Sequence, residues 1–318
     1  MENKIIEITQ NNNELYIYWV LTDFCNQTCS YCPKNLHSGL FHSIGLVKND
    51  TIDQFMARVI NIVETKNIKL CIDIAGGEPT IVEYLPTIIA KLKPYGKINL
   101  ITNGTRSLSW WENLSVLPSG VIITLHPEYY DKKKLRINDL AHFLVDNHVS
   151  VSFNLMCQPD RWETTMSIFE DLDNQFKKLV IPKVINNQDV YDRPIAGYTQ
   201  EHLDFINSHT NEVPPDSTVT YDDYSVNNLN ANRIMSKNQH QFKGWSCAAG
   251  VNAICVKENG NVYAGICNSK NLGTMSNFKL LDEYITCPRP SCTCPGDIKL
   301  SKYNPMVRRT GIEPIFTV

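Results

Sequence analysis

The sequence predicts an α/β protein: a partial, TIM-like (β/α)6 barrel followed by a small cysteine-rich β-hairpin domain. From Leu15 to Pro182, short apolar runs typical of strands alternate with longer stretches of helical periodicity, the pattern of a parallel sheet covered by helices. Two later apolar runs flank a tight turn, and six of the eleven cysteines lie between residues 246 and 296. The 318 residues suffice for one large α/β domain and a small second unit.

Each unit of the predicted barrel begins with a short apolar run. The six strands are expected at Leu15–Leu21, Lys69–Ile74, Ile98–Ile101, Val121–Leu125, Val149–Met156 and Lys178–Pro182. Apolar residues at helical spacing lie between them in Ile52–Val63, Tyr84–Leu92 and Leu140–Val145. In (β/α) barrels the chemistry lies on the loops that follow the carboxyl ends of the strands, so the functional residues are expected in those loops.

Composition and charge indicate a globular protein of the cytoplasm. Hydrophobic residues make up 42% and charged residues 20%, enough to build a large core. The net charge of −3 disfavours a nucleic-acid partner, because such binding comes mainly from clustered Lys and Arg. The start, Met1–Asn13, is polar, and no apolar run reaches the length of a membrane span. In the cytoplasm the cysteines stay reduced, so we interpret them as metal ligands, reactive thiols or core residues.

Three cysteines, Cys25, Cys29 and Cys32, follow the first predicted strand with the spacing CxxxCxxC. Three thiolates on one short loop can hold three irons of a [4Fe-4S] cluster and leave the fourth iron open to a small molecule. Half of a structural zinc site, with His37 or His42 as a further ligand, and disulfide pairing are the alternatives. The barrel context favours iron.

With Tyr31 directly before the third cysteine, this loop resembles the signature of the radical S-adenosylmethionine (SAM) superfamily. The resemblance implies that the amino and carboxylate groups of SAM's methionine chelate the open iron. It also implies that the reduced cluster cleaves SAM to a 5′-deoxyadenosyl radical, with Tyr31 near the adenine. A one-electron donor such as flavodoxin or ferredoxin would supply the electron.

The turn after the second predicted strand is Gly76, Gly77, Glu78 and Pro79, which resembles the GGEP motif of that superfamily. The resemblance implies that the loop backbone and Glu78 meet the amino group of SAM. Glycines let a backbone approach a ligand closely, and an ammonium needs hydrogen-bond acceptors. An ordinary strand-to-helix turn with Pro79 at the helix start is the alternative.

Polar residues also follow the next three predicted strands. Thr102 and Asn103 resemble the TNG turn of the superfamily, and we expect them to face SAM, although a plain turn explains them equally well. His126 is a candidate contact to SAM or a general base, and a structural histidine is the alternative. Asn154 is expected near SAM. Cys157 is interpreted as a core residue, with hydrogen-atom transfer to a substrate radical as the alternative.

The second unit is expected to be a hairpin of strands Val251–Val256 and Val262–Cys267, preceded by a cysteine and followed by a cysteine-rich loop. Cysteines brought together from a hairpin and a later loop make a metal site. The candidate ligands are Cys247, Cys267, Cys287, Cys292 and Cys294. These five compete for at most four places on one cubane, and Cys255, inside a strand, is interpreted as a packing residue.

This arrangement resembles the twitch domain, the shorter relative of the SPASM domain, which carries an auxiliary [4Fe-4S] cluster in many radical SAM enzymes. The usual pattern places a cysteine where this chain has Gly265, and Cys267, two residues further and on the same face of a strand, is taken as the substitute. The resemblance implies a cluster that accepts an electron from the substrate radical or positions the substrate. A structural zinc is the alternative.

The expected organisation is a radical SAM partial barrel at residues 1–195, a connecting region at 196–245, a twitch- or SPASM-like cluster domain at 246–296 and a C-terminal tail at 297–318. The expected function is abstraction of a hydrogen atom from a small-molecule or sugar-like substrate. One alternative is a radical SAM enzyme that crosslinks or epimerises a ribosomal peptide. Another is a non-catalytic module that binds zinc or an iron-sulfur cluster.

Overall fold

The computed structural model describes residues 3–10, 13–32, 47–130, 136–186, 194–210 and 215–307. Its main sheet has nine strands in the order β13-β12-β11-β2-β3-β4-β5-β6-β7, and β2 to β7 run parallel. These six strands are β2 (Glu14–Thr22), β3 (Lys69–Gly76), β4 (Gly96–Thr102), β5 (Gly120–Leu125), β6 (Ser150–Cys157) and β7 (Val180–Val184). All six predicted strands, and the partial barrel, are therefore confirmed.

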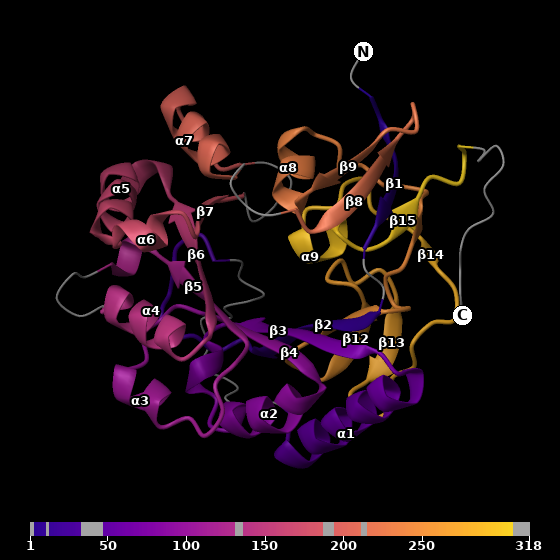
Figure 1. Ribbon diagram of the computed structural model, residues 1–318, viewed down its shortest axis with the longest axis horizontal. Coiled ribbons are helices and arrows are strands. Elements are labelled where there is room, and N and C mark those ends of the chain that lie inside the picture. Colours follow the sequence, from indigo (N-terminus) through magenta and orange to yellow (C-terminus); the bar gives the residue numbers. More distant parts are fainter. Residues whose placement is uncertain are drawn as a thin grey trace.

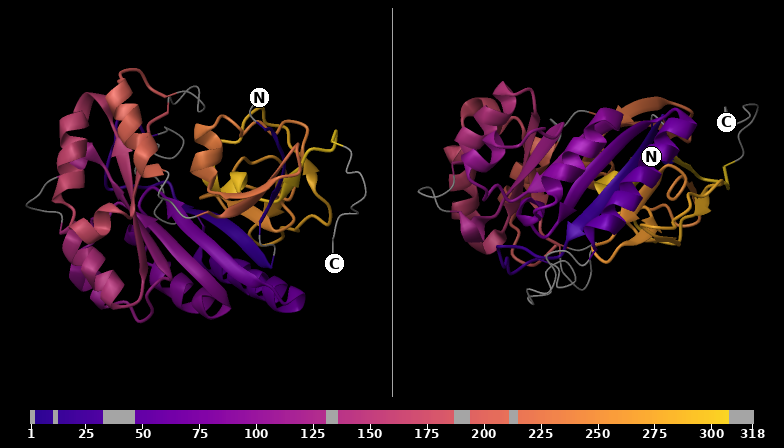
Figure 2. Two further views of the ribbon diagram at one scale, coloured as in Figure 1. Left: turned by 45° about the horizontal axis from the view of Figure 1, so that its top comes forward. Right: turned by 90° about the horizontal axis from the view of Figure 1, so that it is seen from below.

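Helices cover the outer face of the barrel sheet, as Figures 1 and 2 show. They are α1 (Asn49–Lys66), α2 (Leu85–Leu92), α3 (Leu108–Glu112), α4 (Ile137–Asp146), α5 (Trp162–Asp171) and α6 (Asn174–Lys177). In α1, Ile52, Phe55, Met56 and Val59 are buried at the spacing of one helical face. The ring of Phe55 lies edge-on to Trp19 of β2, with centroids 5.0 Å apart. Apolar burial of this kind holds the helices to the sheet.

A second sheet of six strands, in the order β14-β10-β15-β1-β8-β9, lies on the other side of the barrel sheet from these helices (Figures 1 and 2). Its strands are β1 (Ile5–Thr9), β8 (Ser217–Tyr221), β9 (Val226–Leu229), β10 (Ser246–Cys247), β14 (Ile285–Thr286) and β15 (Lys302–Tyr303). Three more helices belong to this half of the chain: α7 (Gln200–Thr210), α8 (Ala231–Ser236) and α9 (Pro295–Ile298).

The second sheet joins parts of the chain that are far apart in sequence. Strand β1 pairs with β8 and β15, so the N-terminal strand lies with the C-terminal half and not in the barrel sheet. The stretch 196–245, expected to be a connecting region, contains β8, β9, α7 and α8. The stretch 297–318, expected to be a tail, contributes β15. The division of the chain into separate domains stays a prediction.

The predicted hairpin is present as β11 (Ala253–Val256) and β12 (Asn261–Ala264), and β13 (Asn271–Thr274) extends it. Strand β11 also pairs in parallel with β2, so the hairpin continues the barrel sheet. The expectation that Cys267 lies on a hairpin strand was wrong. Strand β12 ends at Ala264, and Gly265 with φ of +65° turns the chain away.

None of the helices in the described ranges combines the length and the apolar character that crossing a membrane requires.

Candidate active site

The loops after the parallel strands enclose a cavity of about 410 Å³ at the carboxyl end of the barrel. All three cysteines of the CxxxCxxC loop line this cavity. The predicted site residues in its wall are Cys25, Cys29, Tyr31, Cys32, Gly76, Gly77, Thr102, Asn103 and His126. Glu78, Pro79 and Asn154 are not in the wall, and Met156, two residues beyond Asn154 on β6, is. The sequence therefore predicted most of a wall to which all six parallel strands contribute.

The cysteine loop is fixed from one side by the loop after β4. The side-chain amide of Asn103 donates to Asn26 Oδ1 at 2.8 Å, and Asn26 Nδ2 donates to Thr105 Oγ1 at 2.8 Å. Asn103 Nδ2 also lies 3.9 Å from the sulfur of Cys25, to which the backbone N–H of Gln27 donates at 3.4 Å. Asn103 thus positions the loop and offers a hydrogen bond to a thiolate.

The loop after β5 holds the cysteine loop from the other side. The backbone N–H of Thr28 donates to Tyr129 Oη at 2.7 Å, and that of Ser30 donates to Glu128 Oε2 at 2.8 Å. The sequence did not reveal these two contacts, because Glu128 and Tyr129 are distant in sequence from their partners. The sign that the sequence offered was that Glu128 and Tyr129, two polar residues, follow closely after a predicted strand.

The two glycines of the GGEP turn are required by the protein's own backbone. A Cβ atom on Gly76 would lie 2.2 Å from the carbonyl oxygen of Thr22, and one on Gly77 would lie 2.1 Å from that of Phe24. This close approach lets Gly77 N–H donate to Thr22 O at 2.7 Å. The turn therefore packs directly on the strand end that leads into Cys25, and it also lines the cavity.

Glu78 is fully buried, and its carboxylate joins two loops of the barrel. It accepts hydrogen bonds from Thr80 N at 3.0 Å, Thr80 Oγ1 at 2.6 Å, Thr102 Oγ1 at 2.7 Å and Asn103 N at 2.6 Å. Pro79 begins the short 3-10 turn Pro79–Ile81, as the alternative interpretation of this motif expected. Both oxygens of Glu78 thus have protein partners, two of which, Thr102 and Asn103, line the cavity themselves.

Replacing Glu78 with Gln is therefore expected to act through protein structure. The amide NH2 of glutamine would face the N–H and O–H groups that now donate to the carboxylate. One buried polar group without a partner lowers the free energy of unfolding by about 1–3 kcal/mol. We expect a lower melting temperature and, because Asn103 shifts, weaker SAM binding. Thermal melting and calorimetric titration of SAM would measure both. Weaker SAM binding with an unchanged melting temperature would instead support a direct contact between Glu78 and SAM.

His126 is buried beside the cysteine loop, and burial lowers its pKa to about 4. Its Nδ1 is hydrogen-bonded to Tyr31 Oη at 2.8 Å and lies 3.4 Å from Cys29 Sγ. The two rings are stacked, with centroids 6.1 Å apart. At neutral pH the imidazole is therefore uncharged, and its contacts orient Tyr31 over the cavity.

The three loop thiols are partly buried, and burial raises their pKa values, to about 12 for Cys29 and about 11 for Cys32. A bound cation overturns this balance, since metal-coordinated thiols are deprotonated. The side-chain oxygen Oε1 of Gln27, in the same wall, is buried and has no hydrogen-bond partner among the described residues. Convergent thiols, donors to sulfur and an open acceptor fit an iron-sulfur cluster with a ligand that carries an ammonium.

Within the described residues no three His, Cys, Asp or Glu side chains are grouped closely enough to hold a metal ion, and this holds for the three loop thiols as well. His37 and His42 lie outside the described residues.

The other candidate ligands, called the second cysteine cluster below, are the free thiols Cys247, Cys267, Cys287, Cys292 and Cys294. Among the described residues no three of them are grouped closely enough to hold a metal ion. They come from β10, from the turn after β12 and from the loop that runs into α9. Burial, and after it the nearby Asp297, raise the pKa of Cys294 to about 12. Arg289 donates to the carbonyl of Cys267 at 2.9 Å, which joins the loop to the turn. The thiol set suits the soft iron of a cluster.

The remaining cysteines are core residues. Cys157 has no exposed surface and packs in the main core, and burial raises its pKa to about 12. Cys71 on β3 and Cys255 on β11 are also buried. None of the three lines the cavity. Their interpretation as packing residues agrees with these positions.

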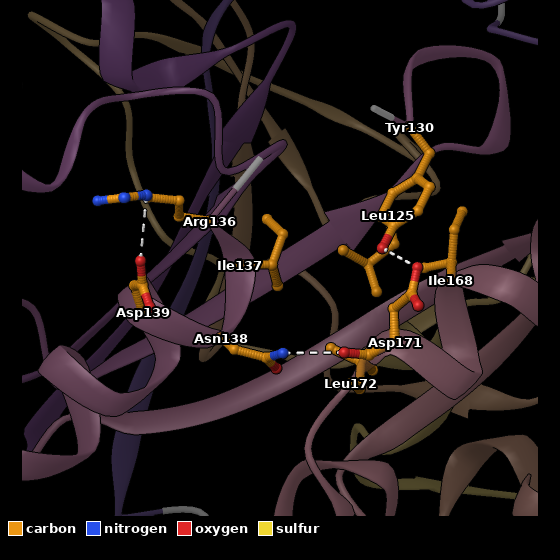
Figure 3. Close-up of a pocket in the computed structure, with 9 residues that line it drawn as sticks. All are labelled: Leu125, Tyr130, Arg136, Ile137, Asn138, Asp139, Ile168, Asp171 and Leu172. Carbon is orange, nitrogen blue, oxygen red and sulfur yellow. Dashed lines mark hydrogen bonds and ion pairs between the residues drawn. The ribbon is translucent and has the colours of Figure 1, made fainter. Parts of the chain in front are cut away.

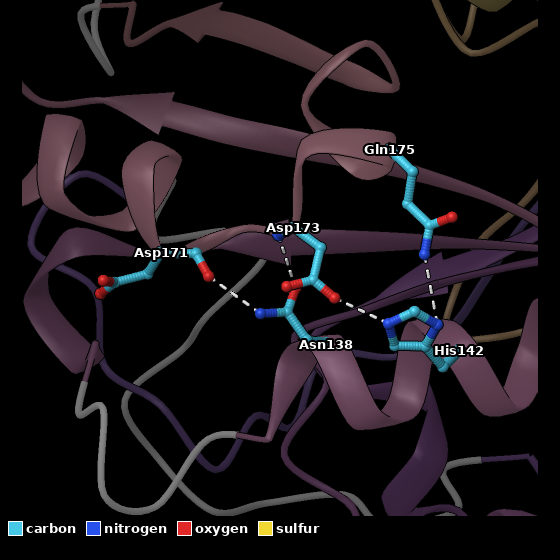
Figure 4. A network of polar contacts seen from close by, with 5 residues as sticks. All are labelled: Asn138, His142, Asp171, Asp173 and Gln175. Atoms are coloured by element: carbon cyan, nitrogen blue, oxygen red, sulfur yellow. Dashed lines mark hydrogen bonds and ion pairs between the residues drawn. The ribbon is translucent and has the colours of Figure 1, made fainter.

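A smaller cavity of about 200 Å³ lies on the outer side of the barrel, between α4 and α5 (Figure 3). In it Tyr130 donates to Asp171 at 2.6 Å, and Asn138 donates to the carbonyl of Asp171 at 2.9 Å. Figure 4 shows Asn138 also accepting from Asp173 N–H at 3.1 Å, while the Asp173 carboxylate lies 2.7 Å from His142. These contacts tie α4 to the segment between α5 and α6, so we assign them to structure.

The fold and the site define a (β/α) barrel domain with three convergent thiols at the carboxyl end of its strands. Residues 19–146 match the model of the radical SAM superfamily. The family implies a [4Fe-4S] cluster and SAM.

Curated relatives match over a short segment. GTP 3′,8-cyclase 2 of Mycobacterium tuberculosis and of Mycobacterium bovis are each 33% identical over 87 residues, which is 26% of this chain. The chain spans about a quarter, 23%, of the length of these relatives.

Solved structures match over most of the chain. The structure of native anSMEcpe with bound AdoMet and Kp18Cys peptide has a TM-score of 0.50 and 15% identity, and the match covers 83% of this chain and 78% of that one. BtrN in complex with AdoMet and 2-DOIA has a TM-score of 0.40 and 15% identity, over 82% and 78%. The first likeness shows a shared fold.

Proposed function

We propose that this chain is a radical SAM enzyme that abstracts a hydrogen atom from its substrate. The observation that carries the proposal is the single cavity in which Cys25, Cys29 and Cys32 meet the glycine turn and the Thr102–Asn103 loop. These cysteines would hold a [4Fe-4S] cluster, and SAM would occupy the remaining space. When bound, the reduced cluster supplies the electron that cleaves SAM to methionine and a 5′-deoxyadenosyl radical.

The chain's own residues would bind and orient these groups. The amide of Asn103 and the N–H of Gln27 donate toward Cys25 Sγ, which stabilises a thiolate. The open acceptor Oε1 of Gln27 is the group that we assign to the ammonium of SAM, in place of the buried Glu78. Tyr31, held by His126, would lie against the adenine. The walls of the cavity would limit the access of water to a radical formed there.

We assign an auxiliary [4Fe-4S] cluster to the second cysteine cluster, in a twitch-like arrangement. Tyr18 supports a functional link between the sites. It lines the cavity, and burial together with the nearby Cys255 and Cys294 thiols raises its pKa. A cluster at this site would accept an electron from the substrate radical or position the substrate.

A small-molecule or sugar-like substrate fits a cavity of about 410 Å³ that SAM would share. Modification of a peptide is the second candidate, favoured by the Kp18Cys peptide in the structure of anSMEcpe. Flavodoxin or ferredoxin would be the electron donor.

The test is the reaction itself. Anaerobically reconstituted protein, reduced with dithionite and given SAM, is expected to form 5′-deoxyadenosine and methionine, both measured by chromatography. Binding of SAM without either product in the reduced protein would overturn the proposed activity. Absence of iron and sulfide after reconstitution would instead favour a non-catalytic zinc module.

A further inference from the structure

The second cysteine cluster is assembled from separate segments of the chain that no disulfide links within the described residues. Cys267 lies in the turn after β12, whereas Cys294 lies 27 residues later, at the N-terminal cap of α9. Within the described residues every cysteine is free, so a disulfide does not fix this geometry. Some other contact must bring the turn and the loop together.

Besides Arg289, which donates to the carbonyl of Cys267, Asp297 in α9 makes such a contact. Its Oδ1 accepts from the backbone N–H of Ile266 at 2.9 Å, and its Oδ2 accepts from that of Cys267 at 2.7 Å. The N–H of Asp297 itself donates to the carbonyl of Cys294 at 2.9 Å. One residue thus binds the main chain at two of the candidate ligands, one in each segment.

The turn is shaped around this carboxylate. Gly265 has φ of +65°, and a Cβ atom there would lie 3.0 Å from Asp297 Oδ1 and 3.2 Å from the Cβ of Ala249. A side chain at residue 265 would therefore displace Asp297. Because Gly265 has no side chain, the carboxylate of Asp297 fits closely against the two N–H donors that follow this glycine.

Asp297 also places a carboxyl group among the thiols. Burial raises its pKa, and the N–H donors of Ile266 and Cys267 and the ammonium of Lys302 act in the opposite direction. Asp297 is 3% exposed, and besides burial it raises the pKa values of Cys267 and Cys294, each to about 12. Lys302, 2% exposed, lies behind it and donates to the carbonyls of Asp297 at 2.6 Å and Ile298 at 2.8 Å. The carboxylate therefore faces the turn and the cysteines, while the ammonium holds the backbone of α9.

We propose that Asp297 is the positioning residue of the second cysteine cluster: it joins the turn at Cys267 to the loop at Cys294, and its charge lowers the reduction potential of a cluster bound there. This inference rests on the proposed auxiliary cluster. Net charge and hydrogen bonding near an iron-sulfur cluster set its potential, and contacts beyond the ligands affect metal affinity strongly.

The test uses the full-length chain with Cys25, Cys29 and Cys32 replaced by Ala, so that only the second cluster contributes. In this background Asp297→Asn is compared with Asp282→Asn, which removes the same charge from an exposed position. Iron release to a chelator is expected to be roughly tenfold faster in Asp297→Asn, because an amide retains at most one of the two hydrogen bonds. Redox titration followed by electron paramagnetic resonance is expected to give a less negative potential.

Equal release rates and equal potentials in Asp297→Asn and Asp282→Asn would overturn the role of Asp297. If the background protein with Asp297 intact binds no iron and sulfide, the proposal of an auxiliary cluster is itself wrong. This outcome can be told apart from the failure of the proposed role of Asp297. If Asp297→Asn does not fold, amide hydrogen exchange in the unsubstituted protein decides the point. The N–H groups of Ile266 and Cys267 are expected to exchange as slowly as those of β12, and exchange at the rate of an exposed loop would contradict the proposal.

Discussion

Replacing Cys25, Cys29 and Cys32 together by Ala is expected to abolish the reductive cleavage of SAM. The three thiols line one cavity, and each would hold one iron, so their loss removes the centre that delivers the electron. The expected result is no 5′-deoxyadenosine above the level of a reaction without protein. Product analysis after anaerobic reconstitution measures it, and iron bound to the second cysteine cluster should remain.

Cys71→Ala is the matched control, because Cys71 is a buried thiol on β3 outside the cavity wall. It should keep product formation close to that of the unsubstituted protein. Undiminished formation of 5′-deoxyadenosine by the triple variant would show that the cluster assigned to this loop is not the catalytic one.

Gly77→Ala is expected to damage both folding and the active site. The added Cβ would lie 2.1 Å from Phe24 O and 3.0 Å from Cys25 N, and backbone atoms cannot yield as the end of a side chain can. Forced overpacking of this kind typically costs about 1–3 kcal/mol, and here the displaced segment is the start of the cysteine loop. We expect a lower denaturation midpoint and a clear loss of iron from the first cluster.

Gly244→Ala provides the comparison, since a Cβ there meets nothing within 4 Å and the variant pays only for its φ of +84°. Chemical denaturation and iron analysis of both variants separate the two effects. Should Gly77→Ala retain its iron and lose no more stability than Gly244→Ala, the close packing of this turn on the cysteine loop would be unimportant.

The sequence predicted the barrel well because its signals are local. Each strand of the parallel sheet is an apolar run of the length that the structure shows, and the loops after β2, β3, β4 and β5 carry the predicted residues into one cavity. The direction of individual side chains did not follow from the motif. Glu78 was expected to face SAM, but its four hydrogen bonds within the protein became visible only once β3 and β4 were placed side by side.

The second sheet could not be predicted, because its pairings join the two ends of the chain. Ile8 lies opposite Lys302, almost three hundred residues away, and β10, β14 and β15 have two residues each. Such short strands carry too few residues to show a period of two. The role of Asp297 was hidden for the same reason, since its partners Ile266 and Cys267 lie thirty residues earlier.

The parallel pairing of β11 with β2 means that the strand leading to the cysteine loop has no free edge. Tyr16 N–H donates to Asn252 O at 2.8 Å, and Ala253 to Val256 continue the ladder along β2. A barrel cut off before β11 would expose a row of unpaired backbone groups beside its own active site, a template for aggregation. Because β11 pairs with both β2 and β12, the barrel sheet leaves no such template at the edge of the strand that leads to the cysteine loop.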